Sequence, residues 1–140
     1  MMIMYSTKYA VSIHILSLIA LKKETSITSD YIAGSVNTNP ALVRRLMSDL
    51  KKAGLIQTQT KIGVTGLLKL PEEISLLEIF KAVENRQDLF AIHQGTNEAC
   101  PVGAKIGSVL EHINGKIQSD FEKELQEMHL SDILLGLSTI

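Results

Sequence analysis

The sequence contains very few cysteine, proline and aromatic residues. Of its 140 residues, one is Cys and three are Pro, Trp is absent, and aromatic residues make up 4%. A single thiol excludes an internal disulfide framework and any metal site that needs several thiolates from one chain. Hydrophobic residues nevertheless reach 45%, so we expect Leu, Ile, Val and Ala to form the core of one compact domain.

A long hydrophobic segment is also absent. The longest apolar stretch, Tyr9 to Leu21, has thirteen residues and includes Ser12, His14 and Ser17. Because a membrane-spanning helix needs about 20 apolar residues, this stretch predicts a core helix instead. It also lacks the basic start and the small-residue cleavage site of a signal peptide. We therefore expect no membrane partner and a cytoplasmic location.

The net charge of −1 conceals two halves of opposite charge. Residues 1–69 contain nine Lys or Arg and three acidic residues, which gives +6. Residues 70–140 contain five basic and twelve acidic residues, which gives −7. The total charge argues against a nucleic-acid partner, but a basic half joined to an acidic half indicates one. We therefore take the basic half as the part that faces DNA.

Two helices are predicted before residue 35. Ser6 or Thr7 can cap a first helix that ends near Leu21. The polar residues that begin the segment 28–33 predict a short second helix, which Gly34 is expected to stop.

A third helix has the clearest start signal. Asn39 is a good N-cap, and Pro40 occupies the first helical position, where a backbone N–H would have no intrahelical partner. Apolar residues at helical spacing continue the helix to Ala53, and Gly54 is expected to end it. Its inward face is predicted to comprise Val43, Leu46, Met47 and Leu50.

A β-hairpin is predicted after the third helix. Residues 55–60 and 67–70 have the pattern of two short strands around a turn that contains Gly63 and Gly66. Helix, short helix, helix and hairpin is the element order of a winged helix-turn-helix, so the predicted fold class is mainly α with a small β-hairpin wing. In this fold the third helix can enter the DNA major groove, which is about 12 Å wide.

The outward side of the third helix and its surroundings supply the candidate DNA contacts. Phosphate anchoring is expected from Lys8, Lys51, Lys52, the helix N-terminus at Asn39, and Lys61 at the hairpin tip. Base reading is expected from Thr38, Ala41, Arg44, Arg45 and Ser48. Each residue taken alone is explained equally well as part of a solvated face, so the prediction depends on their combination.

The pattern of the second half of the sequence predicts one short and one long helix. A helix over residues 76–83 is followed by an irregular segment at 85–103, a long helix over 104–128 and a short helical tail at 132–137. The candidate dimer-interface residues on the long helix are Ile106, Val109, Leu110, Ile113, Ile117, Phe121 and Leu125. This apolar stripe spans about 33 Å, more than the N-terminal domain can cover, so a second copy is the expected partner. The alternative is that the helix packs back onto its own domain.

The single cysteine precedes Pro101 at the start of the long helix. The helix dipole there can lower the pKa of the Cys100 thiol, so Cys100 is a candidate sensor of oxidants or electrophiles. The alternative is an inert, buried cysteine that packs as a small hydrophobic residue. The histidines show no metal-binding spacing, and we expect His14, in an apolar helix, to be a core residue rather than a ligand.

Several segments together resemble the Rrf2 family of bacterial transcriptional regulators. They are Thr7-Lys8-Tyr9-Ala10-Val11, Asn37-Thr38-Asn39-Pro40 with Val43-Arg44-Arg45-Leu46, Leu50-Lys51-Lys52-Ala53-Gly54-Leu55, Glu73-Ile74-Ser75-Leu76-Leu77-Glu78-Ile79 and Cys100-Pro101-Val102-Gly103. The resemblance covers essentially the whole chain, in order. It implies a homodimer on a pseudo-palindromic DNA operator, with the long C-terminal helix pairing across the two-fold axis.

Two features depart from the family pattern. Many members have a wing with three consecutive glycines and an aromatic residue, where this chain has Lys-Ile-Gly-Val-Thr-Gly at residues 61–66, so wing contacts cannot be transferred. Cluster-binding members carry three cysteines before the long helix, where this chain has Cys100 alone, with His93 and Glu98 nearby. The chain therefore resembles the cluster-free branch, and no iron–sulfur cluster or other cofactor is expected.

We predict three parts of one unit: a winged helix-turn-helix domain at residues 1–83, a sensor-like loop at 84–103, and a dimerisation helix and tail at 104–140. The leading function is a sequence-specific DNA-binding transcriptional regulator, a repressor. The alternative is a protein-interaction module that uses the acidic half as its binding surface. No nucleophile–base pair or phosphate-cradling glycine loop occurs at recognisable spacing, so we expect no enzyme.

Overall fold

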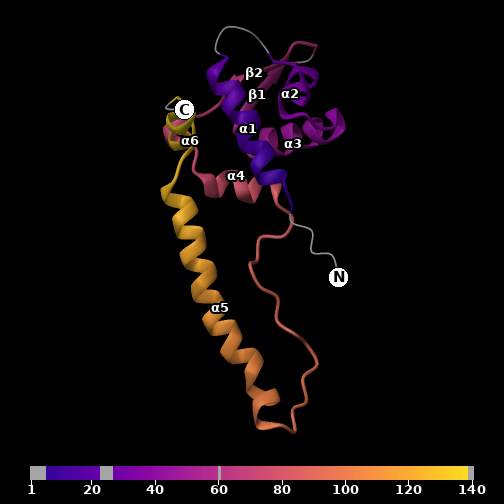
Figure 1. Cartoon of the computed structure of the whole chain (residues 1–140), viewed down its shortest axis with the longest axis vertical. Helices are drawn as coiled ribbons and strands as arrows, with labels where there is room; N and C mark the ends of the chain where they lie inside the picture. Colours follow the sequence, from indigo (N-terminus) through magenta and orange to yellow (C-terminus); the bar gives the residue numbers. More distant parts are fainter. Residues whose placement is uncertain (1–5, 23–26, 60, 139–140) are drawn as a thin grey trace.

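The computed structural model describes residues 6–22, 27–59 and 61–138. Its elements are α1 (Lys8–Leu21), α2 (Ser29–Val36), α3 (Pro40–Lys52), β1 (Ile56–Gln59), β2 (Gly63–Leu67), the 3₁₀ turn η1 (Pro71–Glu73), α4 (Leu76–Val83), α5 (Pro101–Glu127) and α6 (Leu130–Ser138). We call the part formed by α1 to α4, the hairpin and α6 the head, and Figure 1 shows α5 projecting from it. The predicted fold class, mainly helical with a small β-hairpin, is confirmed.

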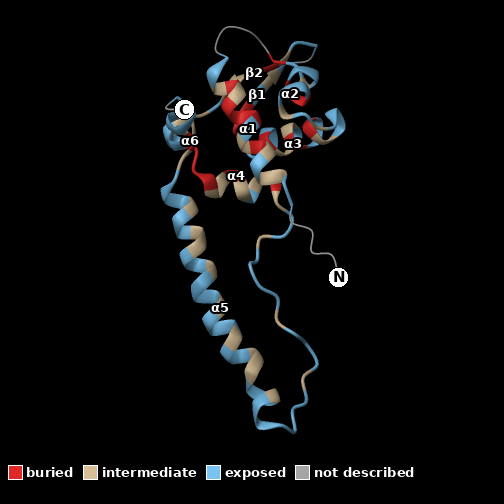
Figure 2. Ribbon diagram, in the orientation of Figure 1, coloured by how far each residue is buried: buried red, intermediate tan, exposed pale blue. Residues whose placement is uncertain are grey.

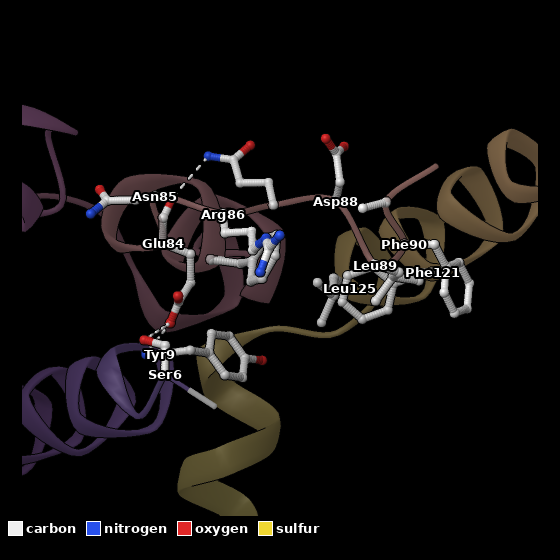
Figure 3. Close-up of a pocket in the computed structure, with 13 residues that line it drawn as sticks. Ser6, Tyr9, Glu84, Asn85, Arg86, Asp88, Leu89, Phe90, Phe121 and Leu125 are labelled. Carbon is white, nitrogen blue, oxygen red and sulfur yellow. Dashed lines mark hydrogen bonds between the residues drawn. The ribbon is translucent and has the colours of Figure 1, made fainter. Parts of the chain in front are cut away.

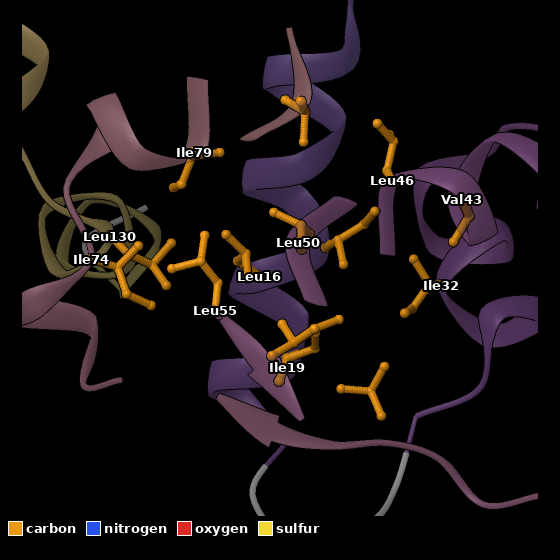
Figure 4. Packing of buried hydrophobic residues seen from close by; sticks show 14 of the residues in the cluster. Leu16, Ile19, Ile32, Val43, Leu46, Leu50, Leu55, Ile74, Ile79 and Leu130 are labelled. Atoms are coloured by element: carbon orange, nitrogen blue, oxygen red, sulfur yellow. The ribbon is translucent and has the colours of Figure 1, made fainter. Parts of the chain in front are cut away.

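Five helices and the hairpin share one aliphatic core. Figures 2 and 4 show that the buried residues gather in the head. Its largest fully buried side chains are Ile15, Leu16, Ile32, Leu46, Leu50, Leu55, Ile56, Ile74, Ile79 and Leu130. Among the residues that the structure describes, no aromatic side chain is fully buried. The prediction that aliphatic residues form the core is therefore confirmed.

The turn between α2 and α3 differs from the prediction. Helix α2 passes through Gly34 and ends at Val36, and the residue that caps it, Asn37, has a φ of 61° in the left-handed region. The backbone N–H of Thr38 then donates a hydrogen bond to the carbonyl of Ala33 at 3.1 Å. This bond gives a partner to one of the carbonyls in the last turn of α2. A glycine ends a helix only where a left-handed residue is needed, and here Asn37 takes that conformation. The expected stop at Gly34 was wrong.

The second strand of the hairpin also lies elsewhere than predicted. Strand β2 contains both Gly63 and Gly66 instead of following them, and Leu68–Leu70 lies beyond it. The turn is earlier because Lys61, with φ of 74°, supplies the left-handed residue that a glycine was expected to supply. Of the first predicted strand, residues 56–59 form β1, and Thr60 lies outside the described residues. An isolated bridge between Ile27 and Val64 adds a third, very short strand to the sheet.

Helices α4 and α6 close the side of the head nearest to α5. The α4 helix forms over the predicted residues, and Ser75 and Glu78 form a capping box at its start, with N···O distances of 3.1 and 3.2 Å. The predicted tail is a helix of nine residues, α6, in which Leu130 is fully buried. The Leu76 N–H, at the start of α4, donates a hydrogen bond to the Met128 carbonyl at 2.8 Å, and the Leu130 N–H donates one to the Ile74 carbonyl at 2.9 Å. The chain therefore returns to the head after α5.

Helix α5 begins at Pro101, three residues before the predicted start, and none of its residues is buried. Its 27 residues extend about 40 Å at 1.5 Å per residue. The segment between α4 and α5 has no regular helix or strand, as predicted. None of the helices in the described part of the chain is both long and apolar enough to cross a lipid bilayer.

Candidate nucleic-acid interface

Helix α3 is held rigidly at its N-terminal end. Asn39 caps it, and its side-chain oxygen accepts a hydrogen bond from the backbone N–H of Ala41 at 2.7 Å. Pro40 occupies the first turn, as predicted. Val43, Leu46 and Leu50 are fully buried and fix the opposite side of the helix against the core, whereas Met47 is half-buried at the edge of this face. The N-terminal end of α3 is therefore exposed on a well-fixed helix.

All the predicted outward residues of α3 are exposed. They are Ala41, Arg44, Arg45, Ser48, Lys51 and Lys52. The two predicted contact residues before the helix differ in solvent exposure. Asn39 is exposed, whereas Thr38 is half-buried in the turn. Asp49, the one acid on the helix, is half-buried. The face that α3 presents to solvent is therefore mainly basic and polar, with Ala41 as an apolar member.

A hollow of about 410 Å³ separates α3 from the hairpin. Arg44, Ser48 and Lys51 line it from α3. Ser29 at the start of α2 and Thr58 of β1 line the other side, and neither was predicted as a site residue. Their polar side chains carry no sequence signal of their own, because only the packing of α2 and β1 brings them beside α3. Arg45 and Lys52, which are seven residues apart, share a neighbouring strip of the same helix face.

The two predicted contacts outside α3 lie at different places on the head. Lys61 is exposed at the tip of the hairpin, beside the turn in which Ile62 donates its backbone N–H to Gln59 at 3.1 Å. Lys8 is half-buried at the start of α1, the end of that helix that lies away from the hairpin in Figure 1. The structure therefore groups Lys61 with α3 and its hollow more closely than Lys8.

The basic residues of α3 form no ion pair with the acidic residues that the structure describes. The ion pairs of the described residues join Lys69 to Glu78 at 2.7 Å and Lys81 to Glu122 at 3.5 Å. Neither pair involves a residue of α3 or the hairpin tip. Charges without an internal partner are free to attract an anionic ligand such as a phosphate backbone.

Cys100 lies at the N-terminal end of α5, and its side chain is exposed. Backbone hydrogen bonds from Gly103 and then Val102 lower the pKa of the Cys100 thiol, because they stabilise the thiolate. In this chain the alternative of a buried cysteine is wrong, since α5 projects away from the core. A redox role for Cys100 stays a prediction.

Histidine and acidic side chains do not converge into a metal site. Within the described ranges, no three His, Cys, Asp or Glu side chains are grouped to hold a metal ion. His14 is exposed, with its Nε2 at 3.0 Å from Ser35 Oγ, so its expected place in the core was wrong. The reason is that α1 turns Ile15, Leu16 and Ile19 inward and His14 to the opposite side.

The apolar stripe of α5 divides into two parts. Phe121 and Leu125 are half-buried at the head, where the Phe121 ring meets that of Phe80 edge to face at 5.6 Å. Farther along the helix, Val109, Ile113 and Ile117 are 51%, 49% and 42% exposed. Ile106 and Leu110 are half-buried. Packing onto its own domain therefore accounts only for the last turns of α5.

Comparisons with known proteins agree over nearly the whole chain. The Rrf2 family model, described as an iron-dependent transcriptional regulator, matches residues 5–135. YwnA of Bacillus subtilis (strain 168), named as an HTH-type transcriptional regulator, is 44% identical over 131 residues, which are 94% of this chain and 97% of YwnA.

Solved structures with this fold include two that cover most of the chain. A crystal structure described as that of a DNA binding protein is 41% identical, with a TM-score of 0.73 over 91% of this chain and 98% of that one. CymR (YrzC), the global cysteine regulator of B. subtilis, has a TM-score of 0.69 at 21% identity over 95% and 97% of the two chains. The second similarity shows a common fold.

The family's description names iron, but this chain does not fit an iron–sulfur cluster. Such clusters are held mainly by several cysteine thiolates, and Cys100 is the one cysteine of the sequence. Its thiol is exposed, and no group of metal-ligating side chains is found among the described residues. No step considered below therefore involves an iron–sulfur cluster.

The fold, the basic face of α3 and the similarity to known proteins all lead to one assignment. The family model and a relative at 44% identity each cover more than nine-tenths of the chain. The chain therefore belongs to the Rrf2 family of transcriptional regulators, which are not enzymes.

Proposed function

We propose that this protein is a sequence-specific DNA-binding repressor that acts as a homodimer on a pseudo-palindromic operator. The observation that carries the proposal is the outward face of α3, where Arg44, Arg45, Lys51 and Lys52 are exposed and unpaired by acids of the described residues. A basic face on the second helix of a helix-turn-helix matches the surface that enters the major groove. In this arrangement a bound dimer covers its operator and excludes other proteins from it.

The positions of the side chains divide the DNA contacts into two kinds. Arg44, Arg45 and Ser48 are exposed in the middle turns of α3 and are the base readers, because Arg can donate two hydrogen bonds to a guanine edge. Lys51 and Lys52, at the C-terminal end of α3, bind phosphates and set the register on the duplex. Ser29 and Thr58, across the hollow, are in place to donate hydroxyl hydrogen bonds to the same strand.

The homodimer is supported by the free part of α5. Val109, Ile113 and Ile117 are about half exposed along one face, and the head cannot reach them. Exposed apolar residues in a continuous stripe are typical of an interface. A second copy with the same stripe covers them symmetrically and places two α3 helices in one complex. Two-fold symmetry in the protein then requires two half-sites in the operator.

Cys100 supports redox control of this regulator in the bacterial cytoplasm. The thiolate is the reactive form of cysteine, and the backbone of Val102 and Gly103 stabilises it on an exposed residue. Oxidation to sulfenic acid or a mixed disulfide at the start of α5 alters the helix that pairs the two copies.

Two substitutions on α3 test the division into base and phosphate contacts. Arg45→Ala is expected to relax the sequence preference, because each bidentate Arg–guanine contact provides about 1–3 kcal/mol of discrimination. Lys52→Ala is expected to weaken binding to all sequences alike and to reduce its salt dependence. Selection of bound duplexes from a random pool measures the first effect, and fluorescence anisotropy with one selected duplex measures the second.

Each substitution is the control for the other, since both remove one positive charge from the same helix face. If both variants lose affinity with an unchanged sequence preference, direct base reading by Arg45 is refuted. The spacing of the selected half-sites also tests the dimer, which is expected to give two half-sites about one helical turn apart.

A further inference from the structure

The aromatic residues gather at the place where α1, α4 and α5 meet. The chain has three Phe and three Tyr. Four of these six, Tyr9, Phe80, Phe90 and Phe121, line one open cavity of about 1040 Å³ (Figure 3). A core built from aliphatic residues does not need this cluster, so its position calls for an explanation of its own.

Three rings form one wall of the cavity. Tyr9 of α1 meets Phe80 of α4 with ring centroids 6.1 Å apart, and Phe80 meets Phe121 of α5 at 5.6 Å, both edge to face. Partial burial of the Tyr9 phenol raises its pKa, because burial disfavours the charged form. Leu125 of α5 also lines the cavity, and Phe90 stands at its edge, 54% exposed. The wall therefore offers ring faces and edges to an apolar ligand.

Three charged residues of the segment after α4 also line the cavity. Glu84 is already engaged, because its Oε1 accepts hydrogen bonds from Ser6 Oγ at 2.9 Å and from the Tyr9 backbone N–H at 3.0 Å. Arg86 makes no hydrogen bond or ion pair with the other described residues, and Figure 3 shows its guanidinium group pointing in among the lining residues. The carboxylate of Asp88 points away from them in the same view. Of the two lining charges that have no partner among the described residues, only that of Arg86 points in among the lining side chains in this view.

We propose that this cavity binds a small apolar carboxylate, such as an aromatic acid. The ring of the ligand packs against Phe80 and Phe121, and its carboxylate pairs with the guanidinium of Arg86. Arg presents two parallel N–H groups that match the two oxygens of a carboxylate. The cavity volume is at the upper end of the range for small-molecule sites, which are mostly apolar with a few placed polar groups.

Hydrogen bonds connect the segment that lines the cavity to both α1 and α5. Glu84 holds the N-terminal end of α1, the helix that begins at Lys8. On the other side, Gln118 of α5 accepts a hydrogen bond from the Leu89 N–H at 2.9 Å and donates one to the Gln87 carbonyl at 2.9 Å. A ligand in the cavity therefore acts on α1 and α5 together. This regulatory consequence rests on the proposed DNA binding, whereas the ligand site does not.

Binding is measured on the full-length protein without DNA, by calorimetry and by NMR of the aromatic signals. The probes are benzoate, the neutral benzyl alcohol and the cationic benzyltrimethylammonium, which share a ring and differ in charge. Benzoate is expected to bind saturably at millimolar concentration, to shift the Tyr9 ring signals, and to bind about tenfold more tightly than benzyl alcohol. Equal affinity for the three probes, or no saturable binding of benzoate, overturns the proposal.

Two pairs of variants locate the site. Arg86→Gln is expected to weaken benzoate binding about tenfold and to leave benzyl alcohol binding unchanged. Lys123→Gln, which also removes an exposed positive charge but outside the lining of the cavity, leaves both unchanged. Phe90→Ala is expected to weaken both probes, and Tyr31→Ala, which also removes an exposed ring but outside the cavity, weakens neither. Unchanged benzoate affinity in Arg86→Gln refutes the carboxylate site. If wild-type protein binds benzoate and fails to bind DNA, the proposed function is refuted and the ligand site stands.

Discussion

Gly63 is a residue at which the hairpin tolerates no side chain. Its φ of 103° lies in the region that favours glycine, and a Cβ built there would lie 2.8 Å from the Ile27 carbonyl oxygen. That carbonyl accepts a hydrogen bond from the Val64 N–H at 3.0 Å, and the Ile27 N–H donates one to the Val64 carbonyl at 3.1 Å. The close approach of two backbones is therefore what the glycine permits.

Gly63→Ala is expected to lower the free energy of unfolding by about 1–3 kcal/mol, because it adds backbone strain and a steric conflict with fixed backbone atoms. Urea denaturation followed by circular dichroism measures the change. Gly66→Ala is the matched control in the same strand, since a Cβ there meets no atom within 4 Å and the φ is not in the left-handed region. Equal stability of the two variants would contradict this account of Gly63.

Cys100 is a second residue whose chemistry depends on its place in the fold. The backbone donors that lower its thiol pKa exist only because α5 starts at Pro101. In the unfolded chain these donors are lost, and the thiol returns to its ordinary pKa. The thiolate fraction near neutral pH is therefore higher in the folded protein than in the unfolded one.

The pH profile of Cys100 alkylation by iodoacetamide tests this difference. The midpoint is expected at lower pH in native protein than in protein unfolded in guanidinium chloride, because a lowered pKa forms the thiolate sooner as the pH rises. Mild oxidation is also expected to weaken operator binding reversibly in wild-type protein and not in Cys100→Ala. A midpoint equal to or above that of the unfolded chain, or equal oxidation sensitivity of both proteins, would contradict a sensing role.

At the scale of elements, α5 is the helix whose apolar side chains the monomer leaves largely uncovered. Its last turns are anchored by Phe121 and Leu125, and the rest lies beyond the reach of the head. Glu122 and Lys81 add an ion pair of 3.5 Å between α5 and α4, so the direction of the helix is set at the head. The free stripe is then presented at a defined angle to a second copy.

Ile113→Glu is expected to convert the dimer to monomer, because a second copy would have to bury an unpaired carboxylate at the centre of the stripe. Such burial opposes association by several kcal/mol, which raises the dissociation constant by about a hundredfold or more. Sedimentation velocity measures the association state. Leu135→Glu on α6 is the control, with the same type of change at a residue that is 65% exposed. A monomeric wild type, or an Ile113→Glu variant that remains dimeric, would contradict the proposed interface.

At the scale of the whole molecule, the two charge halves of the sequence correspond to two different sets of elements. The half with net charge +6 comprises α1, α2, α3 and the hairpin, and the half with −7 comprises α4, α5 and α6. The basic half holds the candidate DNA contacts, and the acidic half holds the free apolar stripe. A duplex is therefore attracted to one side of the molecule and repelled by the other.

The affinity for DNA is accordingly expected to fall steeply with salt. The proposed phosphate contacts of Lys8, Lys51, Lys52 and Lys61 would number four per chain and eight in the proposed dimer. A protein with roughly 6–10 phosphate contacts loses about 10³–10⁵ in affinity between 50 and 200 mM salt. Fluorescence anisotropy with a random duplex at several salt concentrations measures the slope. A protein-interaction module built on the same fold would show almost no slope, and such a result would favour that alternative.

Capping residues and apolar periodicity predicted the helices well wherever neighbouring residues in the sequence determine the structure. Asn39 and Pro40 predicted the start of α3, and periodic apolar residues predicted α4 and α5 to within a few residues. The errors occurred where contacts with residues distant in the sequence determine the position of a turn. Lys61 and Asn37 take left-handed conformations that glycines were expected to take, because strand pairing with Ile27 and the packing of α2 on α3 set the positions of the turns.

The sequence by itself determined the family, the helical class, the basic face of α3 and the lack of thiolates for a cluster. These properties follow from residue types and their spacing along one helix, which local hydrogen bonding and hydrophobic burial translate directly into structure. Only the tertiary structure decided that Ser29 and Thr58 face Arg44, and that Phe121 lines an aromatic cavity instead of the free stripe. Such groupings join residues far apart in the chain, and only the packing of helices and hairpin around one core brings them together.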